Sequence, residues 1–414
     1  MGAAGLSGIE PFARTASAAT LPPPQLSGID HIILVMMENR SFDHFLGWLP
    51  GADGRQAGLT FLDRNNVPHT THALAPDFQG CGQADPDHSY SGGRVAFNDG
   101  ACDGWLRAGN NDEFSIGYYR RRDLSFFGQA APDWTICDRY FPSIMAATLP
   151  NRLYQHAAQT DRLDDSISFS TLPTIWDRLA ARGIEGRYYF ADVPAVALWG
   201  LKYLSIARPF ISFLIDCWLG TLPAVSFVDP PFLAAVVGGT FGDDHPHADI
   251  RAGEAFMNLI YTFVTTGPKW RRTVLVFNFD EWGGFFDHVP PPTAPIPDAD
   301  RAAGNEDGRL GFRVPCMVVS PFARREVSNT VFDHTSVLKM IEWRFGLEPL
   351  TVRDATANNL AEVLDFTHNH VPLLYPVPFG PFGGVCPDFA ATTSGAVNEW
   401  SILRDMARGV GWPI

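Results

Sequence analysis

Two apolar segments that each end in a pair of oxygen-bearing side chains constrain this sequence most. The segment 31–37 is almost entirely apolar and is followed directly by Glu38-Asn39, and the segment 273–279 is followed in the same way by Asp280-Glu281. Continuous apolar runs indicate strands that are covered on both faces, as in a parallel sheet. Because open α/β sheets bind ligands at the carboxyl ends of their strands, we expect these four side chains to meet at one edge of a sheet and form one metal site.

The rest of the chain alternates apolar strands with helical segments. Further strands are predicted at 187–190, 224–228 and 313–320, and helices at 151–159, 174–182, 248–265 and 336–345. This alternation is typical of a doubly wound fold, so we predict an α/β three-layer sandwich with a mostly parallel central sheet. The segment 195–225 is strongly apolar, but charged residues, Pro209 and Gly220 interrupt it. We expect buried structure or a lipid-facing lip there, and no transmembrane helix.

The chain shows no internal repeat and no clear break between domains. We predict one catalytic domain over residues 28–370, with a loop-rich insertion at about 51–131 that covers the site. Residues 371–414 are predicted to be a C-terminal extension that packs on the same domain. Residues 1–27 are rich in Ala, Gly, Ser and Pro, and are predicted to be either a disordered arm or the remnant of an export signal.

The overall charge excludes one class of partner. The formal net charge is −14, whereas a nucleic-acid-binding protein needs a basic face, so we predict no nucleic-acid partner. The hydrophobic content of 46% with 18% charged residues is that of a globular protein and not of a disordered one.

Six cysteines occur without a CxxC pair or a zinc-binding spacing. Cys137, Cys217 and Cys316 lie in apolar runs and are predicted to be buried thiols. Cys81 and Cys102 flank a polar, Gly-rich loop. Two outcomes are open for this pair: a disulfide between them, if the protein is exported, or two free thiols.

Seven segments in a fixed order carry a resemblance to a known family. They are ENRSFDHFLG, DRYFPSIMAATLPNRLY, GTLPAVSFVDP, DDHPHADIRAGE, FDEWGGFFDHVPPP, RVPCMVVSPFARR and FDHTSVLKMIEWRFGL, and they run from about residue 29 to residue 347. In these segments the chain resembles the bacterial phosphoesterases that include phosphatidylcholine-type phospholipases C and a related acid phosphatase. Plant non-specific phospholipases C belong to the same family. The resemblance implies an alkaline-phosphatase-like fold.

The family's nucleophile falls on Thr148. We expect its hydroxyl at a helix N-terminus, where backbone N–H groups and the helix dipole favour an anion. Coordination to a cation would make the hydroxyl reactive. Family phospholipases carry Thr at this position and the acid phosphatase carries Ser, so Thr148 favours a phospholipid substrate. The alternative is that Thr148 only caps the helix.

The resemblance also implies a metal site. The predicted ligands of one divalent metal ion are Glu38, Asn39, Asp280 and Glu281, with Thr148 completing the set. Oxygen ligands favour Ca²⁺, Mg²⁺ or Mn²⁺ over Zn²⁺. The alternative is that these side chains only satisfy the backbone of the loops at the strand ends.

Four histidines are weighed as site residues. His245 and His88 match family site positions, and His245 is expected to protonate the leaving alkoxide and later to activate water. His288 follows Asp280 by eight residues, across a Gly-Gly turn that lets it fold back to the site. His334 begins a predicted helix, where a capping role competes with a catalytic one.

Together these features predict a metal-dependent phosphoric ester hydrolase. The first hypothesis is a phospholipase C that acts on phosphatidylcholine-like lipids through a phosphothreonine intermediate. The alternatives are a phosphomonoesterase of the acid phosphatase type and an inactive relative that only binds. Ala146-Ala147 and Trp282 depart from the family pattern and suggest a somewhat different substrate.

The predicted partners are a phospholipid or a small phosphate ester, with transient contact to a membrane surface. Because family members are often exported, we predict a periplasmic or secreted protein, with a cytoplasmic one as the alternative.

Overall fold

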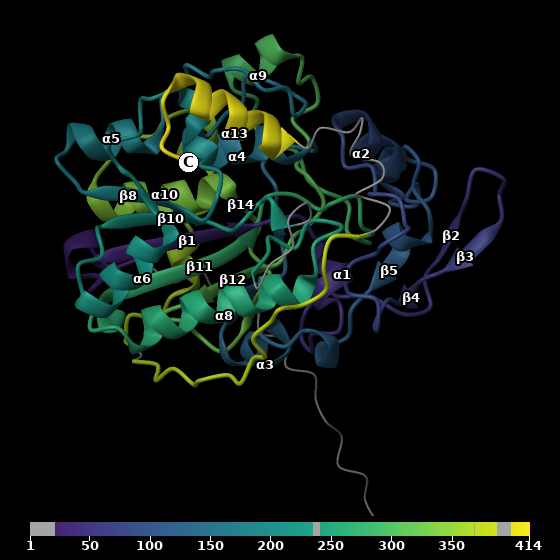
Figure 1. Cartoon of the computed structure of the whole chain (residues 1–414), viewed down its shortest axis with the longest axis horizontal. Coiled ribbons are helices and arrows are strands. Elements are labelled where there is room, and N and C mark those ends of the chain that lie inside the picture. The colour runs from purple at the N-terminus through teal and green to yellow at the C-terminus, as the bar shows by residue number, and fades with distance from the viewer. Residues whose placement is uncertain (1–20, 235–240, 368, 387–398) are drawn as a thin grey trace, which may run out of the picture.

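A computed structural model of the chain describes residues 21–234, 241–367, 369–386 and 399–414 (Figure 1). Its centre is an eight-stranded sheet in the order β13-β6-β12-β11-β1-β10-β8-β9. The middle strand β1 (His31–Met37) pairs in parallel with β10 (Val225–Asp229) and with β11 (Thr273–Phe279). All seven residues of β1 and of β11 are buried, which confirms two strands covered on both faces.

The sheet is mostly parallel, as predicted. On one side β8 (Gly186–Phe190) and β9 (Ala207–Pro209) continue the parallel order from β10. On the other side β12 (Cys316–Val319) is antiparallel to both β11 and β6 (Thr135–Cys137), and β13 (Val327–Ser328) returns to the parallel direction beside β6.

The strand predicted at 313–320 is therefore too long. The backbone of Arg313 and Val314 bonds elsewhere: the Arg313 carbonyl accepts from Phe42 N and Val314 N donates to the Tyr140 carbonyl. Only Cys316–Val319 joins the sheet.

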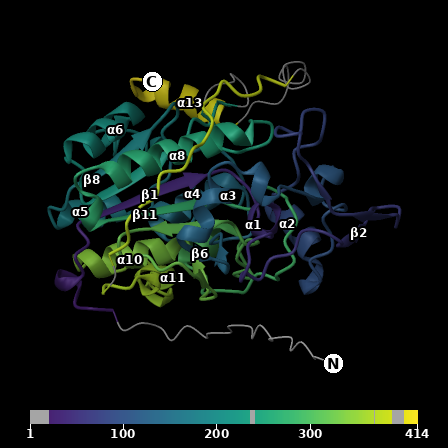
Figure 2. The same cartoon turned by 90° about the horizontal axis from the view of Figure 1, so that it is seen from below.

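Helices cover both faces of the sheet and confirm the three-layer α/β sandwich (Figure 2). On one face α6 (Phe210–Leu219) packs against α8 (Ile250–Thr266). On the other face α4 (Thr148–Ala157) packs against α5 (Ile175–Ala181) and α10 (His334–Phe345). The α4 helix begins three residues earlier than predicted, because Pro150 is accommodated in its first turn, where a backbone N–H has no intrahelical partner anyway.

Short elements between β1 and α4 gather beside the carboxyl end of the sheet (Figure 1). They are α1 (Phe42–Leu46), β2 (Thr60–Leu62), β3 (Pro68–Thr70), β4 (His72–Ala73), α2 (Tyr90–Phe97), β5 (Gly117–Tyr118), α3 (Phe127–Ala130) and, after β6, β7 (Tyr140–Phe141). The remaining elements are α9 (Asp298–Ala303), β14 (Phe332–Asp333), α11 (Val352–Thr356) and α13 (Glu399–Val410). Short 3-10 helices lie at Pro24–Leu26, Asn98–Gly100, Glu113–Ile116, Arg121–Asp123, Ala131–Asp133, Ala195–Trp199, Trp270–Arg272 and Leu360–Val363.

The cysteine prediction for the loop after β4 is wrong in both of its forms. Cys81 forms a disulfide with Cys386, 305 residues later, at a Cα–Cα distance of 5.4 Å, and Cys102 is a buried free thiol. The pairing of distant cysteines is set by the tertiary fold, so sequence spacing alone does not give it. Cys137, Cys217 and Cys316 are buried thiols, as predicted.

The apolar segment 195–225 folds into a 3-10 helix, β9 and α6. Within the described ranges, no helix is long and apolar enough to cross a membrane. The α6 helix is buried on one side, but Ile211, Ile215 and Trp218 lie exposed on its other side at helical spacing. Of the N-terminal arm predicted at residues 1–27, positions 1–20 lie outside the described residues.

The disulfide should stabilise the folded chain because it restricts the unfolded one. We expect the double variant Cys81→Ser/Cys386→Ser to lose about 2–5 kcal/mol of unfolding free energy. Urea unfolding followed by circular dichroism measures this loss. Wild-type protein treated with a reductant should unfold at the same urea concentration as the double variant. Equal midpoints for oxidised wild type and variant would contradict the prediction.

Glu254 on α8 should make stability depend on pH. It accepts hydrogen bonds from Phe126 N and Phe127 N, and burial raises its pKa to about 8. The folded state therefore holds a proton that the unfolded state releases near pH 4.3. The stability that this proton gives to the folded state is fully present below about pH 4.3 and is lost as the pH rises through about 8. It amounts to about 1.4 kcal/mol for each unit by which the folded-state pKa exceeds the unfolded-state pKa.

We expect Glu254→Gln to remove this loss. Urea unfolding at pH 5 and at pH 8.5 should show a smaller drop in stability for Glu254→Gln than for wild type. The exposed Glu348 gives a matched control, because Glu348→Gln should follow the wild-type pH curve. The prediction fails if the Glu254→Gln drop equals that of wild type.

Candidate functional site

Three carboxylates meet at the carboxyl ends of neighbouring strands. Glu38 directly follows β1, Asp280 directly follows β11, and Asp229 is the last residue of β10. The register pairs Met37 with Phe279, so the exits of β1 and β11 are level. The structure therefore brings the two predicted strand-end pairs together.

Arg152 on α4 holds these carboxylates in place. Its Nη2 lies 3.3 Å from Glu38 Oε1, its Nη1 3.1 Å from Asp229 Oδ1 and its Nε 3.2 Å from Asp280 Oδ2. One guanidinium thus faces three carboxyl groups in a buried site, which leaves an excess of negative charge. Burial raises the pKa of Glu38 well above its usual range, that of Asp229 to about 7 and that of Asp280 to about 6. A further cation at this point would allow all three groups to ionise.

A tight glycine turn brings Asn39 and Glu281 into the same place. Gly283 has a positive φ of 62°, and a Cβ atom there would lie 2.0 Å from the Asn39 backbone oxygen, so only glycine fits. Gly283 N donates to Glu281 Oε2 at 2.7 Å. Burial raises the pKa of Glu281 to about 8. At Gly284, a Cβ would lie 2.6 Å from the backbone of Pro86, so the same turn also touches the loop that carries His88.

Several oxygens of this cluster lack a partner. Among the residues at these strand ends, four buried oxygens have no hydrogen-bond donor in the described part of the chain: Glu38 Oε2, Asn39 Oδ1, Asp229 Oδ2 and Glu281 Oε1. A buried acceptor without a donor costs about 1–3 kcal/mol. These oxygens belong to carboxyl and amide groups at the strand ends, and donors of this kind suit a hard divalent cation.

Thr148 is the first residue of α4 and lies one turn before Arg152. The N-cap position belongs to Ala147, and no side chain caps the helix, so the structure does not support a role of Thr148 as the cap. Residues four apart lie on the same face of a helix, which places Thr148 on the face that carries the Arg152 guanidinium. Asn151 fixes the preceding turn by donating to the carbonyls of residues 144, 146 and 147.

Asp165 is a site residue that the sequence reasoning missed. Its Oδ1 accepts from Leu149 N at 2.7 Å, beside Thr148 in the first turn of α4. Its charge also acts on the His88 ring and raises the pKa of that histidine. It lies in a loop between α4 and α5 with no motif around it.

His88 and His245 are brought together, with ring centroids 5.9 Å apart. Burial lowers the pKa of His88, but the carboxylates of Glu281, Asp85 and Asp165 outweigh it and raise the pKa to about 10. Burial lowers the pKa of His245, and Asp85, 3.8 Å from its Nε2, offsets only part of this effect. The pKa values of the two neighbouring rings are therefore shifted in opposite directions.

His288 lies in a separate cluster. Its Nδ1 lies 2.5 Å from Asp43 Oδ2 and its Nε2 3.0 Å from Asp53 Oδ1. The buried guanidinium of Arg313 pairs with Asp43 and Asp287 in the same cluster. This cluster ties the loop after β11 to α1, and the positive charge that balances its acids is already present in Arg313.

His334 contacts the backbone of the site at Asp280. Its Nε2 lies 2.8 Å from the Asp280 carbonyl oxygen, and burial lowers its pKa to about 4, so the ring is neutral at pH 7. The cap of α10 is Asp333, which accepts from Thr335 N. His334 therefore orients the backbone of Asp280 and is not the helix cap.

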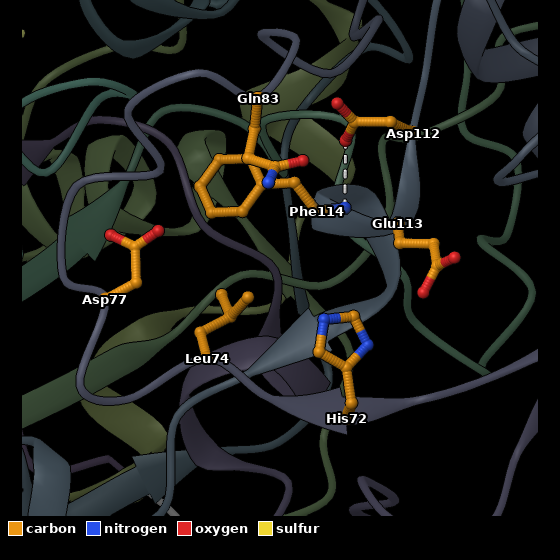
Figure 3. A pocket seen from close by; sticks show the side chains of 7 residues that line it. All are labelled: His72, Leu74, Asp77, Gln83, Asp112, Glu113 and Phe114. Atoms are coloured by element: carbon orange, nitrogen blue, oxygen red, sulfur yellow. Dashed lines mark hydrogen bonds between the residues drawn. The ribbon is translucent and has the colours of Figure 1, made fainter.

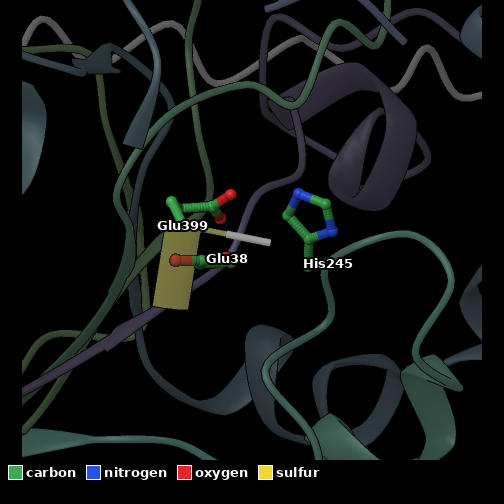
Figure 4. Close-up of side chains that lie close together, drawn as sticks. All are labelled: Glu38, His245 and Glu399. Carbon is green, nitrogen blue, oxygen red and sulfur yellow. The ribbon is translucent and has the colours of Figure 1, made fainter. Parts of the chain in front are cut away.

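The C-terminal helix α13 also reaches the site, for which the sequence gives no signal. Trp400 Nε1 donates to Glu38 Oε1 at 3.0 Å. The ligand atoms of Glu38, His245 and Glu399 lie within 4.8 Å of one another, and the three side chains face a common point (Figure 4). Burial raises the pKa of Glu399.

A cavity of about 370 Å³ lies elsewhere, between β4 and the 3-10 helix Glu113–Ile116 (Figure 3). It is lined by His72, Leu74, Asp77, Gln83, Asp112, Glu113 and Phe114. None of these residues belongs to the strand-end cluster, so we treat the cavity as separate from the candidate catalytic site.

Comparison with known proteins identifies relatives over most of the chain. A family profile described as "Phosphoesterase family" matches residues 29–201 and 194–348. Phospholipase C A of Mycobacterium tuberculosis is 31% identical, covering 86% of this chain and 81% of the relative. Non-specific phospholipase C1 of Arabidopsis thaliana is 29% identical, covering 81% of this chain and 71% of the relative.

Among solved structures, a protein in the alkaline phosphatase superfamily from Vibrio parahaemolyticus matches 79% of this chain and 70% of that chain. Its TM-score is 0.41 and its identity 8%, which is too low to support a functional comparison.

Removing the Arg152 charge should destabilise the folded protein. Arg152→Met leaves three buried carboxyl groups without their cation, and we expect a loss of about 3–5 kcal/mol. Arg152→Lys keeps the positive charge but cannot contact all three carboxyl groups at once, so it should lose less unfolding free energy than Arg152→Met. Urea unfolding in the presence of a chelator measures both. Arg208→Met is the control, because Arg208 is exposed and bonds only to nearby carbonyls. Equal stability of Arg152→Met and Arg208→Met would contradict the prediction.

Proposed function

We propose that this chain, which belongs to the phosphoesterase family and is a phosphoric ester hydrolase, acts as a phospholipase C on phosphatidylcholine-like lipids. The observation that carries the proposal is the convergence of Glu38 and Asp280 on Arg152, one helical turn after Thr148. The names of the curated relatives in a mycobacterium and in a plant support the same substrate class.

One divalent metal ion belongs to the proposal. The residues that would hold it are Glu38, Asn39, Asp280, Glu281 and Thr148, and their oxygen ligands favour Ca²⁺, Mg²⁺ or Mn²⁺ over Zn²⁺. When bound, the ion would stabilise charge on the phosphoryl oxygens and lower the pKa of the Thr148 hydroxyl. The unpartnered oxygens of Glu38, Asn39 and Glu281 support this ligand set.

Thr148 is the proposed nucleophile. Its Oγ attacks phosphorus, and the bond from phosphorus to the glycerol oxygen breaks. The neutral His245 accepts the threonine proton, and the protonated His88 donates a proton to the leaving oxygen, so that diacylglycerol departs as a neutral alcohol. The opposite pKa directions of the two neighbouring rings support this division of roles, which gives the part of the acid to His88 and not, as expected from the sequence, to His245. The head-group phosphate stays on Thr148 as a phosphothreonine.

Water then completes the reaction. His88, now neutral, takes a proton from water as the water oxygen attacks phosphorus, and His245 returns its proton to Thr148 Oγ. The products are phosphocholine and the regenerated enzyme. Two displacements in line retain the configuration at phosphorus. His288 has no step in this scheme, because its ring nitrogens lie against Asp43 and Asp53.

A phosphomonoesterase is the second candidate. The residues above act on the phosphoryl group, which phosphate monoesters share with lipids, so the same steps would release inorganic phosphate from a small ester. Trp282, which departs from the family pattern, is fully buried against Phe312, so this departure reshapes the core under the site. An inactive relative is the third candidate, and the intact Glu38, Thr148 and Asp280 argue against it.

The location and the membrane contact are also proposals. The Cys81–Cys386 disulfide supports a periplasmic or secreted protein, because disulfides persist in oxidising compartments. The exposed apolar stripe of α6, with Trp218 72% exposed, offers a surface for transient contact with lipid.

Substitution of Thr148 tests the nucleophile. We expect Thr148→Ala to lower the turnover of phosphatidylcholine by at least about 10³-fold, because no oxygen remains to attack phosphorus. Thr148→Ser keeps the hydroxyl and should retain measurable turnover. Release of phosphocholine from lipid, measured beside phosphate release from p-nitrophenyl phosphate, separates the phosphodiesterase from the phosphomonoesterase. Chelator should abolish turnover, and added Mn²⁺ or Ca²⁺ should restore it.

Thermal unfolding controls for intact folding of each variant. Turnover by Thr148→Ala at the wild-type rate would overturn the nucleophile assignment. Turnover that survives exhaustive chelation would overturn the metal requirement and leave the nucleophile standing. Release of inorganic phosphate alone would favour the phosphomonoesterase.

A further inference from the structure

The two oxygens of the Glu38 carboxylate are in different situations. Oε1 accepts from Trp400 Nε1 at 3.0 Å and lies 3.3 Å from Arg152 Nη2. Oε2 is buried, and no donor reaches it within the described part of the chain. The carboxylate is thus fixed by one oxygen and leaves the other without a donor, as expected of a metal ligand that is held by outer hydrogen bonds.

The Trp400 ring is itself rigidly held. It stacks face to face on Phe232, with centroids 3.7 Å apart and planes 2° apart. The Arg152 guanidinium lies 4.4 Å from the Phe232 centroid and 5.2 Å from the Trp400 centroid. Trp400 is fully buried. A ring fixed in this way aims its N–H in one direction, and that direction is Glu38.

The rest of α13 is docked by contacts outside the site. Trp412, just after α13, donates from Nε1 to the Gly200 carbonyl oxygen at 3.0 Å and packs edge-on against Phe190. Leu403 and Ala407 are buried on the same helix. The chain therefore carries two buried tryptophans at the two ends of one helix, each donating one indole hydrogen bond, but only Trp400 donates to a site residue.

We propose that Trp400 is a positioning residue of the catalytic centre: its indole N–H holds Glu38 Oε1 so that Oε2 faces the divalent cation. The C-terminal helix is then a working part of the site, although it lies beyond residue 348, where the family match ends. This inference rests on the proposed function, because it assigns Glu38 as a metal ligand. The nearby Glu399, within 4.8 Å of Glu38 and His245, places a second residue of α13 at the same point.

Direct binding of Mn²⁺ tests the proposal without depending on turnover. Wild type, Trp400→Phe and Trp412→Phe are freed of metal and titrated with Mn²⁺ in a calorimeter. Phenylalanine keeps an aromatic ring for the stack on Phe232 and removes the N–H together with part of the indole ring, and the same loss of ring volume at Trp412 is the control. We expect Trp400→Phe to weaken Mn²⁺ binding by about 10- to 100-fold, as for the loss of an outer hydrogen bond to a ligand. Trp412→Phe, which loses the matched bond at the other end, should bind Mn²⁺ within about threefold of wild type.

Turnover gives a second readout. With subsaturating Mn²⁺, Trp400→Phe should show a lower kcat for phosphatidylcholine with an unchanged KM, and saturating Mn²⁺ should restore much of the loss. A purely structural role of Trp400 would not make the defect depend on metal concentration.

Each outcome decides the matter. Wild-type Mn²⁺ affinity in Trp400→Phe overturns the proposal, and so does an equal loss in Trp412→Phe, which would make the effect one of helix docking. If wild type binds no Mn²⁺, both this inference and the proposed oxygen-ligand site for that ion fail. If wild type binds Mn²⁺ but Thr148→Ala retains turnover, the nucleophile assignment fails while the role of Trp400 stands.

Discussion

The guanidinium of Arg152 balances the charge on which the arrangement of the site depends. Three strands deliver Glu38, Asp229 and Asp280 to one buried place, and like charges at that distance would push the strand ends apart. Arg152 reaches all three carboxyl groups from a single helix on one face of the sheet. The same helix begins at Thr148, so the helix that carries the guanidinium also fixes where the hydroxyl lies.

The backbone cooperates with this charge cluster. The Gly283-Gly284 turn after β11 fits against Asn39 and against the loop at Pro86, and a side chain at either glycine would collide there. Three segments far apart in sequence are thereby held in contact by shape, and the Arg313 cluster holds the end of the same loop by charge.

Much of this arrangement could be read from local patterns. Apolar runs with polar exits identified β1 and β11, and parallel strands place such exits at one edge, so Glu38 and Asp280 were expected to meet. The same rule applied to the segment before Asp229 would have found the third carboxylate. Long-range pairings followed no local pattern: Cys81 joins Cys386, and Trp400 joins Glu38 from a segment without a motif. His288 has a sequence spacing that would let it reach the site, but in the structure its ring pairs with Asp43 and Asp53.

The Cys81–Cys386 bond makes one connection of the molecule depend on the redox state of its surroundings. Cys81 stands shortly before Asp85 and His88, and Cys386 lies in the C-terminal extension that also contains Trp400. A covalent bond thus joins the segment that carries His88 to the segment that carries Trp400. Thiols stay reduced in the cytosol, so a newly synthesised chain there lacks this link. The link between these two stretches therefore depends on the redox state of the surroundings, because an oxidising medium forms it and a reducing medium opens it.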